Sequence, residues 1–167
     1  MILKRLVFAL ALFLATLASQ VPEYAQQYRQ RLGGAVDELT RIIAAFDADA
    51  ARLAISRETG LERLKANADT FVRQRGEQIE SDIARAERLQ RQLQSYAEAG
   101  PFHRLALLVR DHDADIARRA FQAFEPAVPV TSEGLMAGMA GFLLGWIGGR
   151  ALIWPVQRRR NRPRVTA

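Results

Sequence analysis

The stretch GLMAGMAGFLLGWIGGRALIW, at residues 134–154, decides how the rest of this 167-residue chain is interpreted. Arg150, near its far end, is its only charged residue. An apolar helix of about 20 residues is long enough to cross the hydrocarbon core of a bilayer. We therefore assign residues 133–154 to a glycine-rich transmembrane helix, with Trp146 suited to packing and Trp154 to the aromatic belt at the membrane surface.

The glycines of this stretch recur every three or four residues, which places them on one helix face. Gly141, Gly145 and Gly149 form two overlapping GxxxG units, a pattern by which membrane helices pack closely. The face, a glycine zipper, predicts packing against the first apolar segment or a second copy of the chain; the alternative is that glycines are simply common in membrane helices. The predicted packing residues are Gly134, Gly138, Gly141, Gly145, Gly148 and Gly149, with Ala11, Ala15 and Ala18 as a matching small face.

A second apolar segment lies near the N-terminus, where residues 6–18 read LVFALALFLATLA and follow Lys4 and Arg5. A helix over residues 6–21 is about 24 Å long, slightly shorter than the ~30 Å hydrocarbon core of a bilayer. The long side chains of Lys4 and Arg5 can reach the membrane surface, which extends the usable length of the helix. We predict an N-terminal transmembrane helix at residues 1–21. The alternative is a secretory signal peptide that is cleaved after Ala18.

Positive charge is concentrated at the two ends of the chain. The sequence has 24 Lys and Arg against 18 Asp and Glu, but residues 22–132 are nearly neutral, with 16 bases and 17 acids. Because bases beside membrane helices stay in the cytoplasm, we predict a multi-pass protein of the bacterial inner membrane with both termini, including a basic tail at residues 155–167, in the cytoplasm. Because the middle of the chain is nearly neutral, we expect no nucleic-acid partner. The residues that set this topology are Lys4, Arg5, Arg158, Arg159, Arg160, Arg162 and Arg164.

Residues 22–132 then form a periplasmic α-helical domain. Apolar positions recur in steps of three or four from Tyr24 to Leu53 and again from Val72 to Tyr96, which predicts two long helices of matched length. The predicted fold class is all-α: two transmembrane helices flanking a periplasmic antiparallel helical hairpin, coiled-coil-like, or a small helical bundle.

Local signals mark the helix ends within this domain. Ser56 and Asp69 are predicted N-caps, and Gly100-Pro101 closes the second long helix. Gly33-Gly34 permits a bend or a close contact in the first. Shorter helices at residues 102–109 and 113–125 are expected to cover the hairpin. Pro126 and Pro129 are expected to end the periplasmic domain.

Residues suited to catalysis are scarce. The chain has no Cys and only two His, His103 and His112, without a cluster around them, so we expect no metal, no cofactor and no enzymatic activity. The segments DADAARLA at 47–54 and DADIARRA at 113–120 each carry two aspartates that could chelate a cation. Their side chains point to different sides of a helix, so we interpret these aspartates as helix caps.

The start of the first long helix mixes Gln, Tyr and Arg. These residues are candidates for contact with lipid headgroups or a protein partner, and the alternative is a packed polar helix start. The candidates are Tyr24, Tyr28, Arg29 and Arg31.

The segments SQVPEYAQQYRQRLGGAVDEL and FEPAVPVTSEGLMAGMAGFLLGW resemble an uncharacterised family of small two-helix bacterial inner-membrane proteins, a domain of unknown function. The resemblance covers nearly the whole chain. It implies two membrane helices flanking an exported helical region, with the first helix uncleaved, and it implies no activity or site residues.

These observations predict a non-enzymatic inner-membrane scaffold or accessory protein with a periplasmic helical domain, acting in envelope maintenance. Its expected partners are membrane lipid and either another protein or a second copy bound through the glycines. The alternative is a lipid- or ligand-binding module at the periplasmic membrane surface.

Overall fold

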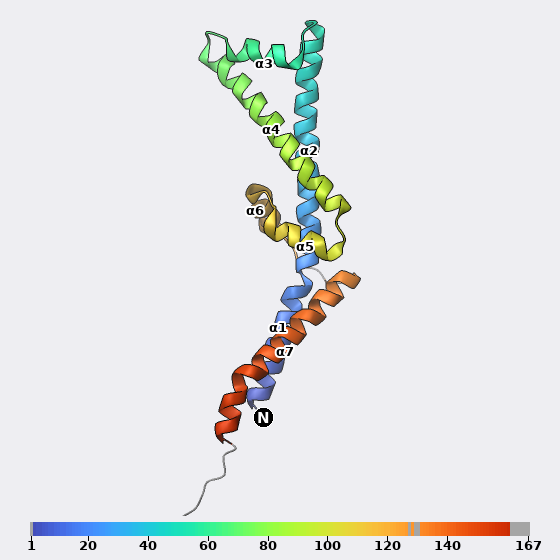
Figure 1. The fold of residues 1–167 in the computed structure, drawn as a ribbon, viewed down its shortest axis with the longest axis vertical. Helices are drawn as coiled ribbons and strands as arrows, with labels where there is room; N and C mark the ends of the chain where they lie inside the picture. The colour runs from blue at the N-terminus through green and yellow to red at the C-terminus, as the bar shows by residue number, and fades with distance from the viewer. Residues whose placement is uncertain (1, 127, 129–130, 161–167) are drawn as a thin grey trace, which may run out of the picture. The chain divides into compact units, whose positions relative to one another are not determined.

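Helices make up the described parts of the chain, which are residues 2–126, 128 and 131–160 of a computed structural model. The predicted all-α fold class is confirmed. The chain divides into two compact units, a terminal unit (Met1–Gln26 with Ala123–Ala167) and a central unit (Gln27–Gln122). The helices are, in order, α1 (Ile2–Ser19), α2 (Val21–Arg52), α3 (Arg57–Lys65), α4 (Thr70–Glu98), α5 (Pro101–Arg110), α6 (Ala114–Gln122) and α7 (Ser132–Arg160) (Figure 1).

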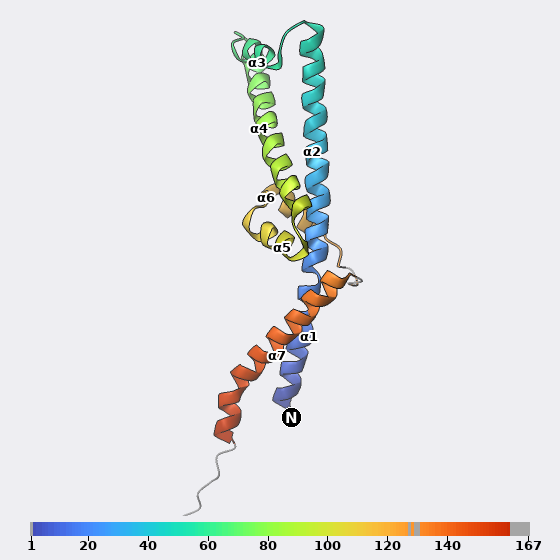
Figure 2. The ribbon, with the colours of Figure 1, turned by 45° about the vertical axis from the view of Figure 1, so that its right-hand side comes forward.

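In the terminal unit, α1 and α7 lie side by side and run antiparallel, as Figures 1 and 2 both show. Both are long and apolar enough to cross a membrane. A turn at Gln20 separates α1 from α2. At the start of α7 the Thr131 hydroxyl accepts a hydrogen bond from the backbone N–H of Gly134 at 3.1 Å, which satisfies a donor that the first helical turn leaves open.

The central unit is built on the two long helices, α2 with 32 residues and α4 with 29, which run antiparallel. Helix α3 connects them at one end of the unit (Figure 1). Both predicted caps are confirmed: Ser56 Oγ accepts from the N–H of Thr59 at 3.2 Å, and Asp69 Oδ1 accepts from the N–H of Phe71 at 2.8 Å. The sequence therefore located both helix starts.

Helix α2 ends in a left-handed turn at Ala54, which has φ 55°. The N–H of Ile55 bonds to the carbonyl of Ala50 at 3.1 Å, and the N–H of Ala54 bonds to that of Ala51 at 3.0 Å. These two bonds form the helix-ending pattern in which glycine usually occupies the left-handed position. Alanine adopts that conformation at a steric cost.

The glycines of the central unit fall into two groups. Helix α2 runs through Gly33 and Gly34 without interruption, and a Cβ at either would meet open space, so neither glycine makes the close contact that the sequence permitted as an alternative to a bend. In contrast, a Cβ at Gly76 of α4 would lie 2.8 Å from Leu64 Cβ of α3. Close approach of backbones in this unit therefore occurs between α3 and α4.

The shorter helices follow the predicted closure of α4. Gly100 and Pro101 begin α5, with the proline in the first turn. Helices α5 and α6 match the two predicted short helices, although α6 stops at Gln122. Pro129, predicted to end this region, lies outside the described residues, as do Arg162 and Arg164 of the basic tail.

Candidate functional site

The contact between α1 and α7 depends on glycine. A Cβ added at Gly141 would lie 2.6 Å from the Cβ of Ala18 and 2.7 Å from the carbonyl oxygen of Leu14. A Cβ at Gly145 would lie 2.8 Å from the Cα of Ala11. These separations are far shorter than the 3.5–4.0 Å at which carbon atoms attract. Only a residue without a side chain fits at either position while the backbones stay where they are.

The contact extends in both directions along the helices. A Cβ at Gly138 would lie 3.3 Å from Ser19 Cβ and 3.4 Å from the carbonyl oxygen of Ala15. At the other end, a Cβ at Gly149 would lie 2.8 Å from Val7 Cγ1. We call this surface of α7 the glycine face; its members are Gly138, Gly141, Gly145 and Gly149.

Two of the predicted glycines, Gly148 and Gly134, are not among the members of the glycine face. Gly148 is exposed, and a Cβ there would meet nothing within 4 Å. The contact follows the four-residue steps from Gly141 to Gly149, and a residue one position earlier on a helix points about 100° away. Gly134 is buried near the start of α7.

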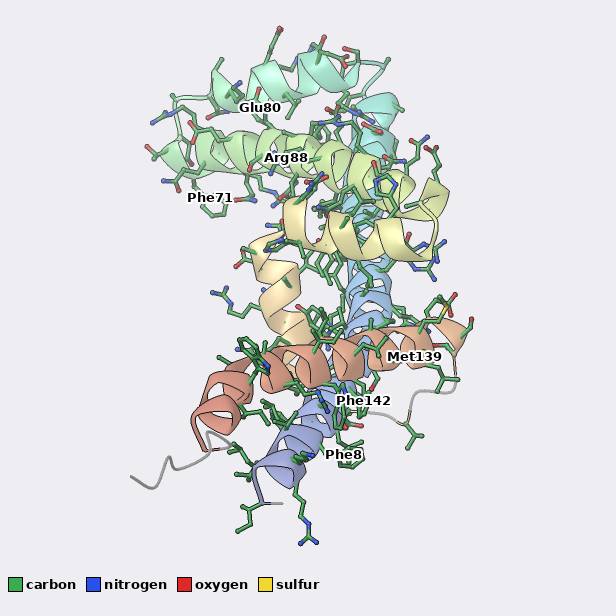
Figure 3. All side chains as sticks on the ribbon, turned by 60° about the horizontal axis from the view of Figure 1, so that its bottom comes forward. Phe8, Phe71, Glu80, Arg88, Met139 and Phe142 are labelled. Carbon is green, nitrogen blue, oxygen red and sulfur yellow. The ribbon has the colours of Figure 1, made fainter. Side chains whose placement is uncertain are left out.

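Aromatic rings flank the glycine face. The ring of Phe8 on α1 meets those of Phe142 and Trp146 on α7 edge to face, at centroid distances of 5.9 and 6.2 Å, and Figure 3 shows Phe8 and Phe142 together. The guanidinium carbon of Arg150 lies 5.8 Å from the centre of the Trp146 ring. Edge-to-face pairs of this kind add to the stability that burial gives.

Away from this contact the two helices expose large apolar side chains. Val7 and Ala11 are buried on α1, whereas its other faces are apolar and exposed. A helix in the core of a water-soluble protein would be covered on such faces. The exposed large apolar residues include Leu6, Phe8, Leu10, Leu12, Phe13 and Leu17 on α1, and Leu135, Met136, Met139, Leu143, Leu144, Ile147 and Leu152 on α7.

In the central unit, hydrogen bonds surround the buried Tyr28, whose ring lies beside that of a second buried tyrosine, Tyr96. The fully buried Tyr28 hydroxyl donates to Gln92 Oε1 at 3.0 Å and accepts from the backbone N–H of Asp113 at 2.9 Å. Gln92 in turn donates to the carbonyl of Asp111 at 2.6 Å, and the rings of Tyr28 and Tyr96 lie 5.8 Å apart. We call Tyr28, Gln92, Tyr96 and Asp113 the tyrosine cluster; it joins α2, α4 and the start of α6.

The four residues predicted to contact lipid or a partner have different surroundings. Tyr28 is fully buried, which removes its side chain from any such contact. Tyr24 is half-buried, and burial raises the pKa of its hydroxyl. Its ring meets that of Phe124 edge to face, with the ring centroids 5.8 Å apart. Arg29 is half-buried and Arg31 is exposed. The regular spacing of Tyr28 and Leu32 was the signal for a core position, but nothing in the sequence identified Gln92 as its partner.

The repeated aspartate segments play two different roles. Asp113 is a helix cap, as predicted: its Oδ1 accepts from the N–H groups of Asp115 and Ile116 at 3.1 and 3.0 Å. Asp47 lies inside α2, so the capping interpretation is wrong there; it accepts from Arg57 Nε at 2.7 Å, and this bond lowers the pKa of its carboxyl. Within residues 2–126, 128 and 131–160, no group of three His, Asp or Glu side chains is placed to hold a metal ion.

These contacts define an all-α protein whose two terminal helices are apolar enough to cross a membrane and pack backbone to backbone. The chain belongs to the family described as "Protein of unknown function (DUF2937)", which matches residues 1–162. No curated protein and no solved structure matches the chain.

Proposed function

We propose that this protein is a membrane-anchored scaffold or accessory protein without enzymatic activity. Helices α1 and α7 form a two-helix anchor in the bacterial inner membrane, both termini lie in the cytoplasm, and residues 22–132 form a periplasmic domain that holds a partner protein in envelope maintenance. The observation that carries this proposal is the glycine face, where an added Cβ at Gly141 would lie 2.6 Å from Ala18.

The glycine face and the exposed apolar surface support a membrane location together. Between membrane helices, association relies on close van der Waals contact, because lipid tails solvate leucine as well as another helix does. Glycine permits that contact while the large side chains point outward. Lipid would cover these apolar side chains, since soluble proteins rarely expose apolar patches of this extent.

The distribution of charge supports the orientation. Lys4 and Arg5 precede the apolar part of α1, and the arginines from Arg158 onward follow that of α7. Bases close to membrane helices favour the cytoplasmic side. Because α1 and α7 run antiparallel, the start of α1 and the end of α7 lie at the same end of the pair, as two crossings require.

The polar groups of the central unit support a structural role over a catalytic one. Tyr28, Gln92 and Asp113 are bonded to one another or to backbone, and Asp47 is paired with Arg57. Groups engaged in this way hold the helices in place, and they leave the charged outer faces of α2 and α4 for contact with a partner.

Two arms of one experiment test this proposal. Alkaline phosphatase fused after Gly100 is expected to be active and the same enzyme fused after Ala167 inactive, because phosphatase folds only outside the cytoplasm; the reverse pattern overturns the topology. The detergent-solubilised protein is then purified by affinity, and its bound proteins and lipids are identified. A stoichiometric protein partner supports the scaffold role, whereas a stoichiometric lipid without a protein partner favours the alternative lipid-binding module.

A further inference from the structure

The end of the terminal unit where α1 begins contains a cavity of about 250 Å³. Lys4 and Val7 line it from α1, and Trp146, Arg150 and Trp154 line it from α7. Sites for whole small molecules usually enclose about 300–1,000 Å³, so this cavity suits a smaller group, such as a headgroup. The packing of Val7 against Gly149 brings the two helices into the register that places Lys4 and Arg150 on the same cavity.

The apolar parts of α1 and α7 hold no acid that could pair with the two bases at this cavity, and Glu133 lies in the first turn of α7. Residues 1–22 and 134–167 contain no Asp or Glu at all. In the described part of the chain, neither Lys4 nor Arg150 forms an ion pair. Two positive charges beside apolar walls are costly to hold together without a counterion, so the cavity favours an anion.

The geometry at Arg150 suits a phosphate. Its guanidinium carbon lies 5.8 Å from the centre of the Trp146 ring. The ring attracts the cation, and a guanidinium directs its N–H donors within its own plane, in a fork that matches two phosphate oxygens. Lys4 supplies a second, flexible donor from the opposite helix.

We propose that this cavity binds the phosphate of an anionic glycerophospholipid between Lys4 and Arg150. This inference rests on the proposed membrane location of α1 and α7. A lipid is favoured over free phosphate because Val7, Ile153 and the two tryptophans give the cavity apolar walls that would cover the glycerol and the first methylenes. The lysine and arginine side chains reach the headgroup level while their stems stay in the apolar region.

Tryptophan fluorescence can report binding in this cavity, because both tryptophans of the chain line it. The full chain in detergent micelles is titrated with phosphatidylglycerol, with zwitterionic phosphatidylcholine and with inorganic phosphate, and tryptophan fluorescence is followed. We expect a saturable change with phosphatidylglycerol and about tenfold weaker binding of phosphatidylcholine, because choline adds a positive charge beside Lys4 and Arg150. Native mass spectrometry of the same samples counts the lipid retained.

Lys4→Gln and Arg5→Gln form the matched pair of variants. They remove the same charge from neighbouring residues, and only Lys4 lines the cavity. Lys4→Gln is expected to shift the titration midpoint about tenfold, and Arg150→Gln at least as far, while Arg5→Gln leaves it near the parent value. Midpoints are compared rather than amplitudes, because loss of Arg150 also alters the fluorescence of Trp146.

Three outcomes overturn the proposal. Equal weakening by Lys4→Gln and Arg5→Gln means general attraction to charged lipid and no site. Competition by millimolar inorganic phosphate means a simple anion site. Absence of a preference for phosphatidylglycerol, in a protein that the phosphatase fusions show to be inserted, removes the lipid site and leaves the proposed anchor intact; a chain that fails to insert contradicts the anchor itself.

Discussion

The two helix pairs of this protein are held together in opposite ways. In the terminal unit, α1 and α7 meet at glycines, and a Cβ added there would meet small side chains and backbone atoms, such as Ala18 Cβ, the Leu14 carbonyl and Ala11 Cα. In the central unit, α2 and α4 are joined through the buried side chains of Tyr28, Gln92 and Tyr96. The first pair depends on the absence of side chains and the second on large ones.

This difference agrees with the proposed locations, because water and lipid stabilise helix pairs by different interactions. In water, removing a large apolar surface from solvent stabilises a helix pair, and buried polar groups must then bond to one another. Among lipid tails that driving force is absent, and close backbone contact takes its place. The two packing modes are those expected if, as proposed, the terminal unit lies in lipid and the central unit in water.

The largest effect is expected from Gly141→Leu, which should separate α1 from α7. The substituted side chain would have to occupy the space of Ala18 and Leu14, so the helices move apart. The measurement is disulfide formation between Ser19→Cys and Gly138→Cys, where the Cβ positions lie 3.3 Å apart and the parent chain has no cysteine. The variant should still insert into membranes but lose most of this crosslink.

Gly148→Leu is the matched control for that experiment. It makes the same change on the same helix, at a position where a Cβ meets open space. It should crosslink as the parent does. Equal crosslinking in Gly141→Leu would show that the glycine face is merely tolerated, and a disulfide dimer from Gly138→Cys alone would show pairing between two copies.

A smaller effect, in the central unit, is expected from Tyr28→Phe. Loss of the hydroxyl leaves Gln92 Oε1 and the N–H of Asp113 without this partner, which should lower the free energy of unfolding of the unit by about 1–3 kcal/mol. Hydrogen exchange of the full chain should show faster exchange in α4 and α6 and unchanged exchange in α1 and α7.

Gln92→Leu and Gln94→Leu sharpen the same test. Gln92 is buried and bonds to Tyr28, whereas Gln94 is exposed and bonds to Glu98. Only Gln92→Leu should speed exchange at the start of α6. If the two glutamine variants behave alike, the tyrosine cluster does not stabilise the unit through its polar bonds.

The smallest effect is expected from Asp47→Asn at the edge of the central unit. The bond from Arg57 lowers the pKa of Asp47 in the folded protein. A depressed pKa means that the pair stabilises the fold above the ordinary carboxyl pKa and loses this contribution as the pH falls through the folded value. Both side chains are more than a third exposed, so we expect a loss of at most about 1 kcal/mol at pH 7.

Thermal unfolding at pH 7 and below pH 3 checks this prediction, with Asp49→Asn as the control. Asp49 pairs with Arg52 within one helix turn, and both side chains are more exposed than those of the first pair. The difference between Asp47→Asn and the parent should shrink in acid. A difference that stays constant with pH would assign the effect to packing instead of charge.

Sequence reasoning predicted most of the local structure because the signals are local. Ser56 and Asp69 lie next to the helix starts that they cap, and three- and four-residue steps located both long helices. Gly148 was included because two spacings fit the same glycines, and only the facing helix shows that Gly149, and not Gly148, contacts α1. The sequence left open whether Tyr28 contacts lipid or a partner or belongs to a packed helix start, because its partner Gln92 is 64 residues away in the chain.

The wide separation of α1 and α7 in the chain has a consequence for biosynthesis. The entire central unit is translated between them, which takes roughly 5–20 s at bacterial elongation rates. On the proposed topology, α1 waits in the bilayer for that time with Ala11, Ala15 and Ala18 uncovered. The apolar side chains of α1 and the charges of Lys4 and Arg5 must therefore keep α1 in the membrane by themselves. The glycine face of α7 can pack against α1 only after the central unit has been made.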